Sequence, residues 1–238
     1  IMRILLLGHG RMGQLVESLA PSYGATIAGI IDERSGERAI ANGDFGHVDV
    51  AIDFTLADAV VKNLPQLAVR KISVVIGTTG WHAHEAAMRE VAAAAGLGVL
   101  AASNFSIGMN VFQLAVEEAS RHFAKHAEFG AWIHESHHVM KQDAPSGTAL
   151  TLKAGMAGAG YTRPIDVSST RAGSVPGTHT IGFDGPSETI ELTHTVRDRS
   201  VFARGALTAA AWLVGKQGWF SIRDMLSESS QETKRSGE

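Results

Sequence analysis

The chain has 238 residues, 45% of them hydrophobic and 19% charged, with a formal net charge of −3 and no cysteine. This length suits one large domain or two modest ones, and the weakly acidic balance argues against a general nucleic-acid-binding protein. The lack of cysteine excludes disulfides and thiolate chemistry. Since no apolar run approaches the ~20 residues that span a bilayer, we expect a cytoplasmic protein with no membrane partner.

The first half of the chain alternates short apolar runs with helical periodicities. Ile1 precedes Met2, which we interpret as the natural start. Strands that are buried on both faces and joined by helices form a parallel sheet. This half therefore predicts a Rossmann-like, doubly wound α/β domain. Its predicted strands are residues 3–7, 26–31, 48–53, 72–76 and 97–101, and its predicted helices are 56–68, 81–95 and one that opens just after residue 7.

After about residue 106 the pattern changes. Glycine and proline turns separate the later strands, which predicts a second, α+β domain with a mixed or antiparallel sheet. We expect residues 1–106 and 206–238 to form a dinucleotide-binding domain, and 107–205 a domain for substrate binding and oligomerisation. The predicted elements are a helix at 111–119, a strand at 128–135, a short helix from Ser146, strands at 167–171, 178–184 and 188–196, a helix at 203–216 and a polar, frayed tail from Ser227.

A glycine-rich loop, Gly8-His9-Gly10-Arg11-Met12-Gly13, follows the first predicted strand and opens a helix. In this context the spacing indicates dinucleotide binding, because the glycines allow a tight turn, close approach of a pyrophosphate and close helix–strand packing. Asp32 ends the second strand, where a carboxylate can bind ribose hydroxyls, whereas Arg34 could pair with a 2′-phosphate. The pattern predicts NADH or NADPH and leaves the choice open. The alternative is a tight turn that holds no ligand.

Two further loops follow the carboxyl ends of predicted strands, where ligands bind in this architecture. They are Gly77-Thr78-Thr79-Gly80 and Ala102-Ser103-Asn104-Phe105. Their hydroxyl and amide groups could bind a carboxamide or a ribose, and Phe105 could cover a ring. Such residues are also ordinary in turns. Their common location makes both loops candidate cofactor contacts.

The stretch from His134 to Ala149 is dense in titratable groups. It fits acid chemistry that accompanies hydride transfer to a carbon–nitrogen or carbon–carbon double bond, with His137 as proton donor and His138 and Lys141 as further cationic donors. Ser146-Gly147-Thr148 opens a helix and predicts a second anion site. Two anion-binding features suggest a small-molecule substrate with two carboxylates.

Three other interpretations of this stretch compete with this one. His134, His137 and His138 could bind zinc, but adjacent residues of a strand point to opposite faces, so no metal is predicted. Ser146 could be a nucleophile, but its surroundings predict a helix cap instead. The cluster could also be only a solvated loop. Glu135 and Asp143 are interpreted as groups that orient the histidines and the lysine.

With these motifs the chain resembles the dihydrodipicolinate reductase family, over almost its whole length. The resemblance implies a two-domain homotetramer that uses NADH or NADPH to reduce the dihydrodipicolinate derived from 4-hydroxy-tetrahydrodipicolinate to tetrahydrodipicolinate, in lysine and diaminopimelate biosynthesis. By motif position, it implies that His137 and Lys141 handle protons, while His138, Gly147 and Thr148 hold carboxylates. Alternatives are another nicotinamide-dependent dehydrogenase of similar architecture or a non-catalytic nucleotide-binding protein. The matching segments are residues 8–13, 77–80, 104–108, 135–149, 171–179 with Phe183, and 202–206.

Overall fold

The computed structural model describes residues 1–36 and 38–235, which form two compact units. One unit combines Ile1–Ser106 with Ser200–Glu238, and the other is Ile107–Arg199. The second boundary therefore lies at 199/200 and not at the predicted 205/206. The reason is that Ser200 begins helix α7 (Ser200–Leu213), which packs as one piece against α1 and strands of the first unit.

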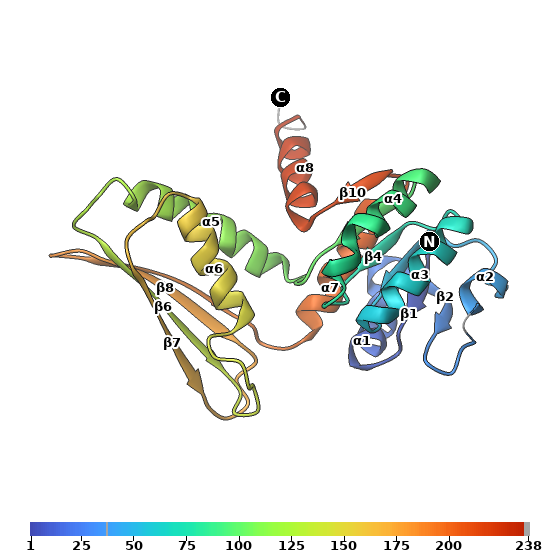
Figure 1. Cartoon of the computed structure of the whole chain (residues 1–238), viewed down its shortest axis with the longest axis horizontal. Coiled ribbons are helices and arrows are strands. Elements are labelled where there is room, and N and C mark those ends of the chain that lie inside the picture. The colour runs from blue at the N-terminus through green and yellow to red at the C-terminus, as the bar shows by residue number, and fades with distance from the viewer. Residues whose placement is uncertain (37, 236–238) are drawn as a thin grey trace. The chain divides into compact units, whose positions relative to one another are not determined.

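The first unit contains a six-stranded sheet in the order β10-β5-β4-β3-β1-β2, and every neighbouring pair is parallel (Figure 1). Helices cover both faces of this sheet, since α2, α3 and α4 share one apolar core with it and α7 packs on β3, β4 and β5 beside α1. The predicted doubly wound, Rossmann-like domain is confirmed. Its strands are β1 (Met2–Leu7), β2 (Ala25–Ile31), β3 (Val50–Asp53), β4 (Val74–Ile76), β5 (Gly98–Ala101) and β10 (Gly218–Phe220), and its helices besides α7 are α1 (Arg11–Leu19), η1 (Ala20–Tyr23), α2 (Ala39–Asn42), α3 (Ala57–Val69), η2 (His82–His84), α4 (Glu85–Ala95) and α8 (Ile222–Arg235).

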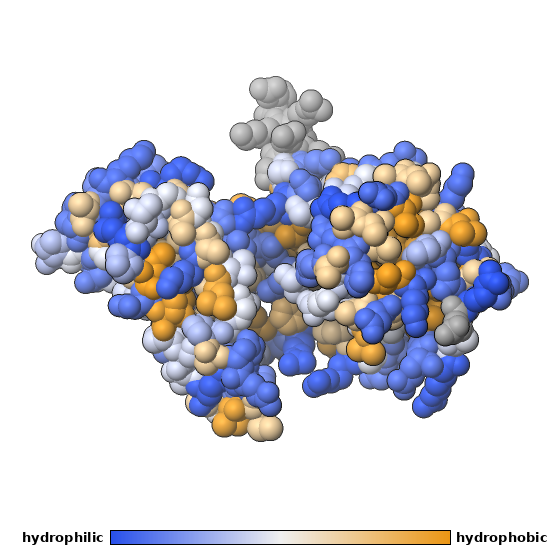
Figure 2. Space-filling model, in the orientation of Figure 1, coloured by the Kyte–Doolittle hydropathy of each residue, from blue (hydrophilic) through white to orange (hydrophobic). Residues whose placement is uncertain are grey.

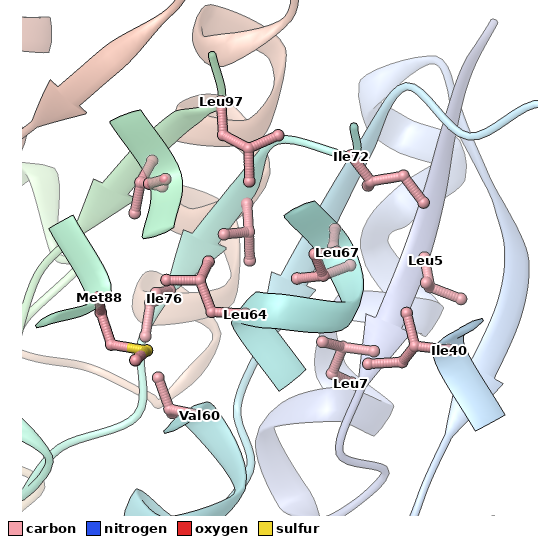
Figure 3. Close-up of a cluster of buried hydrophobic side chains, with 14 of the residues drawn as sticks. Leu5, Leu7, Ile40, Val60, Leu64, Leu67, Ile72, Ile76, Met88 and Leu97 are labelled. Atoms are coloured by element: carbon pink, nitrogen blue, oxygen red, sulfur yellow. The ribbon is translucent and has the colours of Figure 1, made fainter. Parts of the chain in front are cut away.

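The core of the first unit is built from the short apolar runs that predicted its strands. Leu5 and Leu7 of β1 lie in the same apolar cluster as Leu64 and Leu67 of α3, and all four are at most 1% exposed (Figure 3). Complete burial of a leucine is worth roughly 1.5–3 kcal/mol relative to exposure. This packing holds the carboxyl ends of the strands, and the loops that leave them, in fixed positions.

The second unit has a four-stranded sheet in the order β7-β6-β8-β9, with β6 parallel to β7 and antiparallel to β8. Two helices pack on one face of it, so the predicted α+β unit with a mixed sheet is confirmed (Figure 1). The elements are α5 (Ile107–Phe123), β6 (Gly130–His137), α6 (Gly147–Gly158), β7 (Ile165–Arg171), β8 (Thr178–Asp184) and β9 (Thr189–Thr195).

Strand β6 alternates between the two faces of its sheet. Ala131, Ile133, Glu135 and His137 are buried on the helix-covered face, whereas the residues between them are partly exposed. The first two join the apolar core with α5 and α6, and the last two are polar. One face of β6 therefore contributes apolar core residues at its start and a buried, charged cluster at its carboxyl end.

Some predicted elements differ from the observed ones. Strand β10 was missed because three residues are too few to show a period, although Trp219 packs on the core of the first unit. Helix α6 is longer than predicted, with 12 residues. The tail predicted to fray from Ser227 belongs to helix α8, which extends to Arg235.

On the face shown in Figure 2, hydrophobic residues lie interspersed among hydrophilic ones. Large exposed apolar side chains include Leu56, Val69 and Met140. Among the described residues, no helix combines the length and the apolar character that a membrane crossing requires.

Candidate functional site

The glycine loop lies between β1 and α1, as predicted. Gly8 has φ +87°, and a Cβ on it would lie 2.5 Å from the carbonyl oxygen of Phe54, while a Cβ on Gly13 would lie 2.1 Å from the carbonyl oxygen of Gly8. Packing therefore requires both of these glycines. A Cβ on Gly10 would meet nothing within 4 Å, so its glycine is not explained by packing. Gly10 is also the N-cap of α1, and among the residues that the structure describes no side chain caps that helix.

This loop lies at the point where the sheet order reverses. Strand β1 is flanked by β2 on one side and by β3 on the other, and ligands bind at the carboxyl ends of strands at such a switch. Uncapped N–H groups and the positive end of the helix dipole there favour an anion. His9 pairs with Glu17 at 2.7 Å, and Arg11 is exposed.

Asp32 follows β2, with Arg34 two residues later. The backbone N–H of Arg34 donates to Asp32 Oδ1 at 3.0 Å, and the Ser35 hydroxyl donates to the same oxygen at 3.2 Å. The Arg34 N–H lowers the pKa of Asp32, so this carboxylate is ionised near neutral pH. An ionised carboxylate can bind ribose hydroxyls, and the exposed Arg34 remains available for a phosphate.

The loop Gly77–Gly80 is attached to a buried carboxylate for which the sequence predicted no role. Asp53, at the end of β3, is 1% exposed and accepts hydrogen bonds from the hydroxyl of Thr78 at 3.0 Å and the amide of Asn63 at 3.0 Å. The hydroxyl of Thr78 is thus engaged inside the unit. Thr79 is exposed, and it is the loop hydroxyl that a ligand can reach.

The loop after β5 is partly interior. The Ala102 N–H donates to the carbonyl of Ile76 at 3.1 Å, and Asn104 Oδ1 accepts from the Ser106 N–H at 2.9 Å. Phe105, predicted to cover a ring, is 2% exposed and packs edge-on against Phe54, with ring centroids 6.3 Å apart. Its ring therefore belongs to the interior, which corrects that prediction. Ser103 is exposed.

The carboxyl end of β6 carries a buried ionic cluster. Glu135 is 0% exposed and forms a bidentate pair with Arg171 of β7, at 2.7 Å to Oε1 and 2.9 Å to Oε2. Glu135 Oε2 also bonds to Nδ1 of His137. His179 of β8 is 3% exposed and lies edge-on to His137, with ring centroids 5.2 Å apart.

The start of α6 joins this cluster. Ser146 is the N-cap, and its hydroxyl accepts the Ala149 N–H at 3.2 Å, which confirms the predicted cap. The Ser146 N–H donates to Glu135 Oε1 at 3.2 Å, and its hydroxyl lies 3.2 Å from Nε2 of His179. A Cβ on Gly147 would meet nothing within 4 Å, as at Gly10. Thr148, beside it, is partly exposed.

The loop between β6 and α6 carries the remaining predicted groups. Lys141 Nζ contacts both oxygens of Asp143, at 2.7 Å and 2.9 Å, and Arg171 donates to the carbonyl of Asp143. His138 is partly exposed, and its carbonyl accepts the Lys141 N–H at 3.1 Å. Hydrogen bonds therefore connect His137, Lys141 and the start of α6 in one network.

Burial and pairing set the charges of this cluster. Burial alone would raise the pKa of Glu135, but hydrogen bonds from Arg171, Ser169, His137 and Ser146 outweigh it and hold the pKa at about 2. Burial lowers the pKa of His137, and the Glu135 carboxylate opposes that effect. Burial also lowers the pKa of His179 to about 4, with repulsion from His137 acting in the same direction. Near neutral pH, Glu135 is charged and His179 is neutral.

A metal could in principle be held by Glu135, His137 and His179, whose ligand atoms lie within 4.8 Å of one another. The carboxylate of Glu135, however, already accepts hydrogen bonds from Arg171 and His137, and the guanidinium would repel a cation. We interpret the cluster as a hydrogen-bond network. The zinc ligands considered from the sequence are not assembled, because His134 lies on the other face of β6, where it bonds to Ser168 at 2.9 Å.

Comparison with known proteins decides the family. The family model described as "Dihydrodipicolinate reductase, N-terminus" matches residues 2–105, and the model described as "Dihydrodipicolinate reductase, C-terminus" matches residues 108–226. The 4-hydroxy-tetrahydrodipicolinate reductase of Christiangramia forsetii is 36% identical over 240 residues, which cover 95% of this chain and 98% of that protein. The chain belongs to the dihydrodipicolinate reductase family.

Other relatives agree with this assignment. The 4-hydroxy-tetrahydrodipicolinate reductase of Xanthomonas axonopodis pv. citri is 39% identical, with 94% of this chain and 97% of that protein covered. Among solved structures, the dipicolinate-bound dihydrodipicolinate reductase from Paenisporosarcina sp. TG-14 has a TM-score of 0.78 at 20% identity, covering 93% of this chain and 97% of that one. The last likeness shows the shared fold. Membership in the dihydrodipicolinate reductase family confirms the resemblance seen in the sequence and the class of NAD(P)H-dependent oxidoreductase.

In this reductase-family chain, Asp53, Arg171 and His179 were not predicted from the sequence, although the structure places them in contact with candidate site residues. Arg171 and His179 lie in a segment that supported the family resemblance, but nothing local to them indicates a role. Only the strand register shows it, because β6 pairs His137 with Arg171 on one side and Glu135 with His179 on the other.

Proposed function

We propose that this protein uses NADH or NADPH to reduce the dihydrodipicolinate derived from 4-hydroxy-tetrahydrodipicolinate to tetrahydrodipicolinate, in lysine and diaminopimelate biosynthesis. The observation that carries this proposal is in the second unit. A buried His137–Glu135 pair, a lysine and a helix start with an open glycine are linked by hydrogen bonds. Such a set can protonate a substrate and hold its carboxylates.

The first unit fits a dinucleotide. The open position at Gly10 and the uncapped start of α1 leave room and N–H donors for a pyrophosphate. We infer that Gly8, His9, Gly10, Arg11, Met12 and Gly13 surround the phosphates, that Asp32 and Arg34 face the adenosine ribose, and that residues 77–79 and 102–104 contact the nicotinamide half. When bound, the cofactor supplies a hydride to the substrate.

The second unit supplies the proton. Because Nδ1 of His137 bonds to Glu135, Nε2 is the nitrogen that gives or takes a proton at the substrate. Lys141 is the second proton donor, and its pairing with Asp143 on an exposed loop leaves it able to exchange partners. We infer that His138, Lys141, Ser146, Gly147 and Thr148 bind the two carboxylates, with Ser146 acting through its cap.

We further infer a cytoplasmic protein and, as the resemblance implies, a homotetramer. One face of the second unit's sheet carries His134, Thr180 and Thr193, away from α5 and α6. That face and the edge strands β7 and β9 offer backbone and side-chain groups for pairing with another subunit. Analytical ultracentrifugation tests this, and a monomer at micromolar concentration would contradict it.

The deciding experiment is a coupled assay with the pathway precursor, in which NADH and NADPH oxidation are followed at 340 nm. We expect precursor-dependent oxidation of at least one cofactor. Cofactor binding without turnover would support a non-catalytic nucleotide-binding protein instead. Turnover of another carbonyl or imine substrate, with none of the precursor, would support a different dehydrogenase of similar architecture.

A further inference from the structure

The Glu135 carboxylate accepts hydrogen bonds from Arg171, Ser146 and His137 of the second unit's site. Its Oε1 accepts from Arg171 Nη2 at 2.7 Å and from the Ser146 N–H at 3.2 Å, and its Oε2 accepts from Arg171 Nη1 at 2.9 Å and from His137. The side chain is fully buried. Nothing in the proposed chemistry requires this carboxylate to touch the substrate, so its bonds call for another explanation.

We propose that Glu135, clamped by Arg171, is a positioning residue that orients two parts of the machinery at once, the proton donor His137 and the carboxylate-binding start of α6. The inference rests on the proposed function for the roles of those two parts. To those roles the inference adds that one buried carboxylate, Glu135, positions both the group that delivers the proton and the group that binds a substrate carboxylate.

The first part of the argument concerns the tautomer of His137. An ionised carboxylate can only accept hydrogen bonds, so the contact with Glu135 requires the proton on Nδ1. Nε2 is then the nitrogen that exchanges protons. On that side lies Gly177, with φ +152°, where a Cβ would stand 3.0 Å from Nε2. Glycine at this position keeps the approach to Nε2 open.

The second part concerns the start of α6. The first N–H groups of a helix lack partners within the helix and need other acceptors. The Ser146 N–H donates to the Glu135 carboxylate, and the Ser146 hydroxyl accepts the Ala149 N–H. Gly147 follows directly. A shift of the Glu135 carboxylate would therefore move both Nδ1 of His137 and the helix start that we propose holds a substrate carboxylate.

The third part concerns Arg171. A buried carboxylate without a partner is costly, and a planar guanidinium compensates it through two parallel bonds. Arg171 reaches Glu135 because the parallel register places Arg171 beside His137. It also donates to the carbonyl of Asp143, whose side chain pairs with Lys141. The clamp thus extends to the loop that carries the second proton donor.

The charged and titratable groups around His137 come from four segments. They are Glu135 on β6, Lys141 on the following loop, Arg171 on β7 and His179 on β8. Burial lowers the pKa of His137, the hydrogen bond and charge of Glu135 raise it, and the charges of Lys141 and Arg171 lower it. Loss of the Glu135 charge should therefore lower the pKa of His137 further and change which ring nitrogen carries the proton.

The experiment compares Glu135→Gln with wild type and with Glu128→Gln, a matched change at an exposed glutamate just before β6. The pKa and tautomer of His137 are read from ¹⁵N imidazole spectra of the protein without ligands. We expect a lower pKa and a mixed tautomer in Glu135→Gln only. For the reaction, we expect kcat to fall ~10–100-fold and the KM of the dicarboxylate substrate to rise, as for lost supporting hydrogen bonds around a reactive group.

A second pair of variants covers the case in which Glu135→Gln does not fold. Arg171→Lys keeps the charge and loses the bidentate clamp, and Glu135→Asp keeps a shorter carboxylate. We expect each to move kcat and the dicarboxylate KM in the same direction as Glu135→Gln, with Glu135→Asp the milder. Where Glu135→Gln does not fold, wild-type kcat and dicarboxylate KM in both Arg171→Lys and Glu135→Asp would overturn the inference. In folded Glu135→Gln, an unchanged tautomer and pKa of His137 in the imidazole spectra would overturn it. This readout needs no turnover, so failure of the proposed function would appear separately, as a wild-type enzyme that does not reduce the precursor.

Discussion

The three glycines of the loop between β1 and α1 differ in what an added Cβ atom would contact. A Cβ on Gly8 or Gly13 would overlap backbone atoms at 2.5 Å or 2.1 Å, whereas a Cβ on Gly10 would meet nothing. The backbone of Gly10 has φ −74° and ψ −164°, which an alanine can adopt. The same motif therefore contains glycines required by the fold and a glycine that the fold alone does not require.

We predict that Gly10→Ala leaves the free energy of unfolding within about 0.5 kcal/mol of wild type and raises the cofactor KM about 10-fold, because the methyl group enters the space of the pyrophosphate. Gly13→Ala is the matched control and should destabilise the protein by about 1–3 kcal/mol, because it overpacks helix against loop. Denaturant titration and cofactor titration separate the two effects. If Gly10→Ala and wild type have the same cofactor KM, the cofactor phosphates do not bind next to Gly10.

A second prediction concerns His137, the proposed proton donor. His137→Gln should lower kcat ~10²-fold with a smaller effect on KM, as for a lost general acid. In wild type, kcat/KM should decline as the pH rises through the pKa of His137, which burial places below the ordinary value, because the donor must be protonated. This decline should be absent in His137→Gln. A variant with wild-type kcat would assign proton delivery to another group.

At the scale of elements, strand β6 and helix α6 illustrate how the site is assembled. The alternation of β6 directs Ile133 into the apolar core and Glu135 and His137 into the ionic cluster on the same face. Helix α6 begins beside that cluster because its N-cap hydroxyl and N–H are both bonded there. The crossover from β6 through α6 to parallel β7 then delivers Arg171.

The cap of α6 is open to a direct test. We predict that Ser146→Ala costs about 1 kcal/mol of stability, the usual value of a lost N-cap, and raises the KM of the dicarboxylate substrate. Thr151→Ala in the same helix, where a hydroxyl donates to the Gly147 carbonyl on an exposed face, is the control and should leave that KM unchanged. A larger KM effect in Thr151→Ala than in Ser146→Ala would contradict the role of the cap.

At the scale of the whole molecule, the ionic cluster links stability to acid pH. The pKa of His179 falls from 6.5 to about 4 on folding, so the unfolded chain binds more protons between these values and stability decreases as the pH falls from 6.5 to 4. The pKa of Glu135 falls from 4.5 to about 2, so a second decrease occurs between pH 4.5 and 2. Each decrease should be on the order of 3 kcal/mol.

Denaturant titrations at several pH values measure these decreases. His179→Gln cannot titrate and keeps a side-chain partner for Ser146, so it should lose the decrease between pH 6.5 and 4 and retain the one below pH 4.5. Identical pH dependence in wild type and His179→Gln would show that His179 does not contribute. His179 and Glu135 both belong to the second unit, so both decreases in stability should appear in the unfolding transition of that unit.

The sequence by itself determined the architecture and most of the candidate site. Apolar runs alternating with helical periodicities specify a parallel sheet, and a glycine loop between strand and helix specifies where an anion can bind, because these signals are local. The run from His134 to Ala149 predicted acid chemistry in the same way, from residues that are close in the sequence. Family membership then followed from motifs spread along the chain.

Only the tertiary structure decided which partners those local groups have. Arg171 and His179 reach Glu135 and His137 through strand register, and Asp53 reaches Thr78 across neighbouring strands, so no short-range pattern contains these contacts. The interior position of the Phe105 ring and the open spaces at Gly10 and Gly147 likewise depend on packing. Sequence periodicity reports which face a residue takes, whereas contact between distant segments depends on register and on the shape of the packed core.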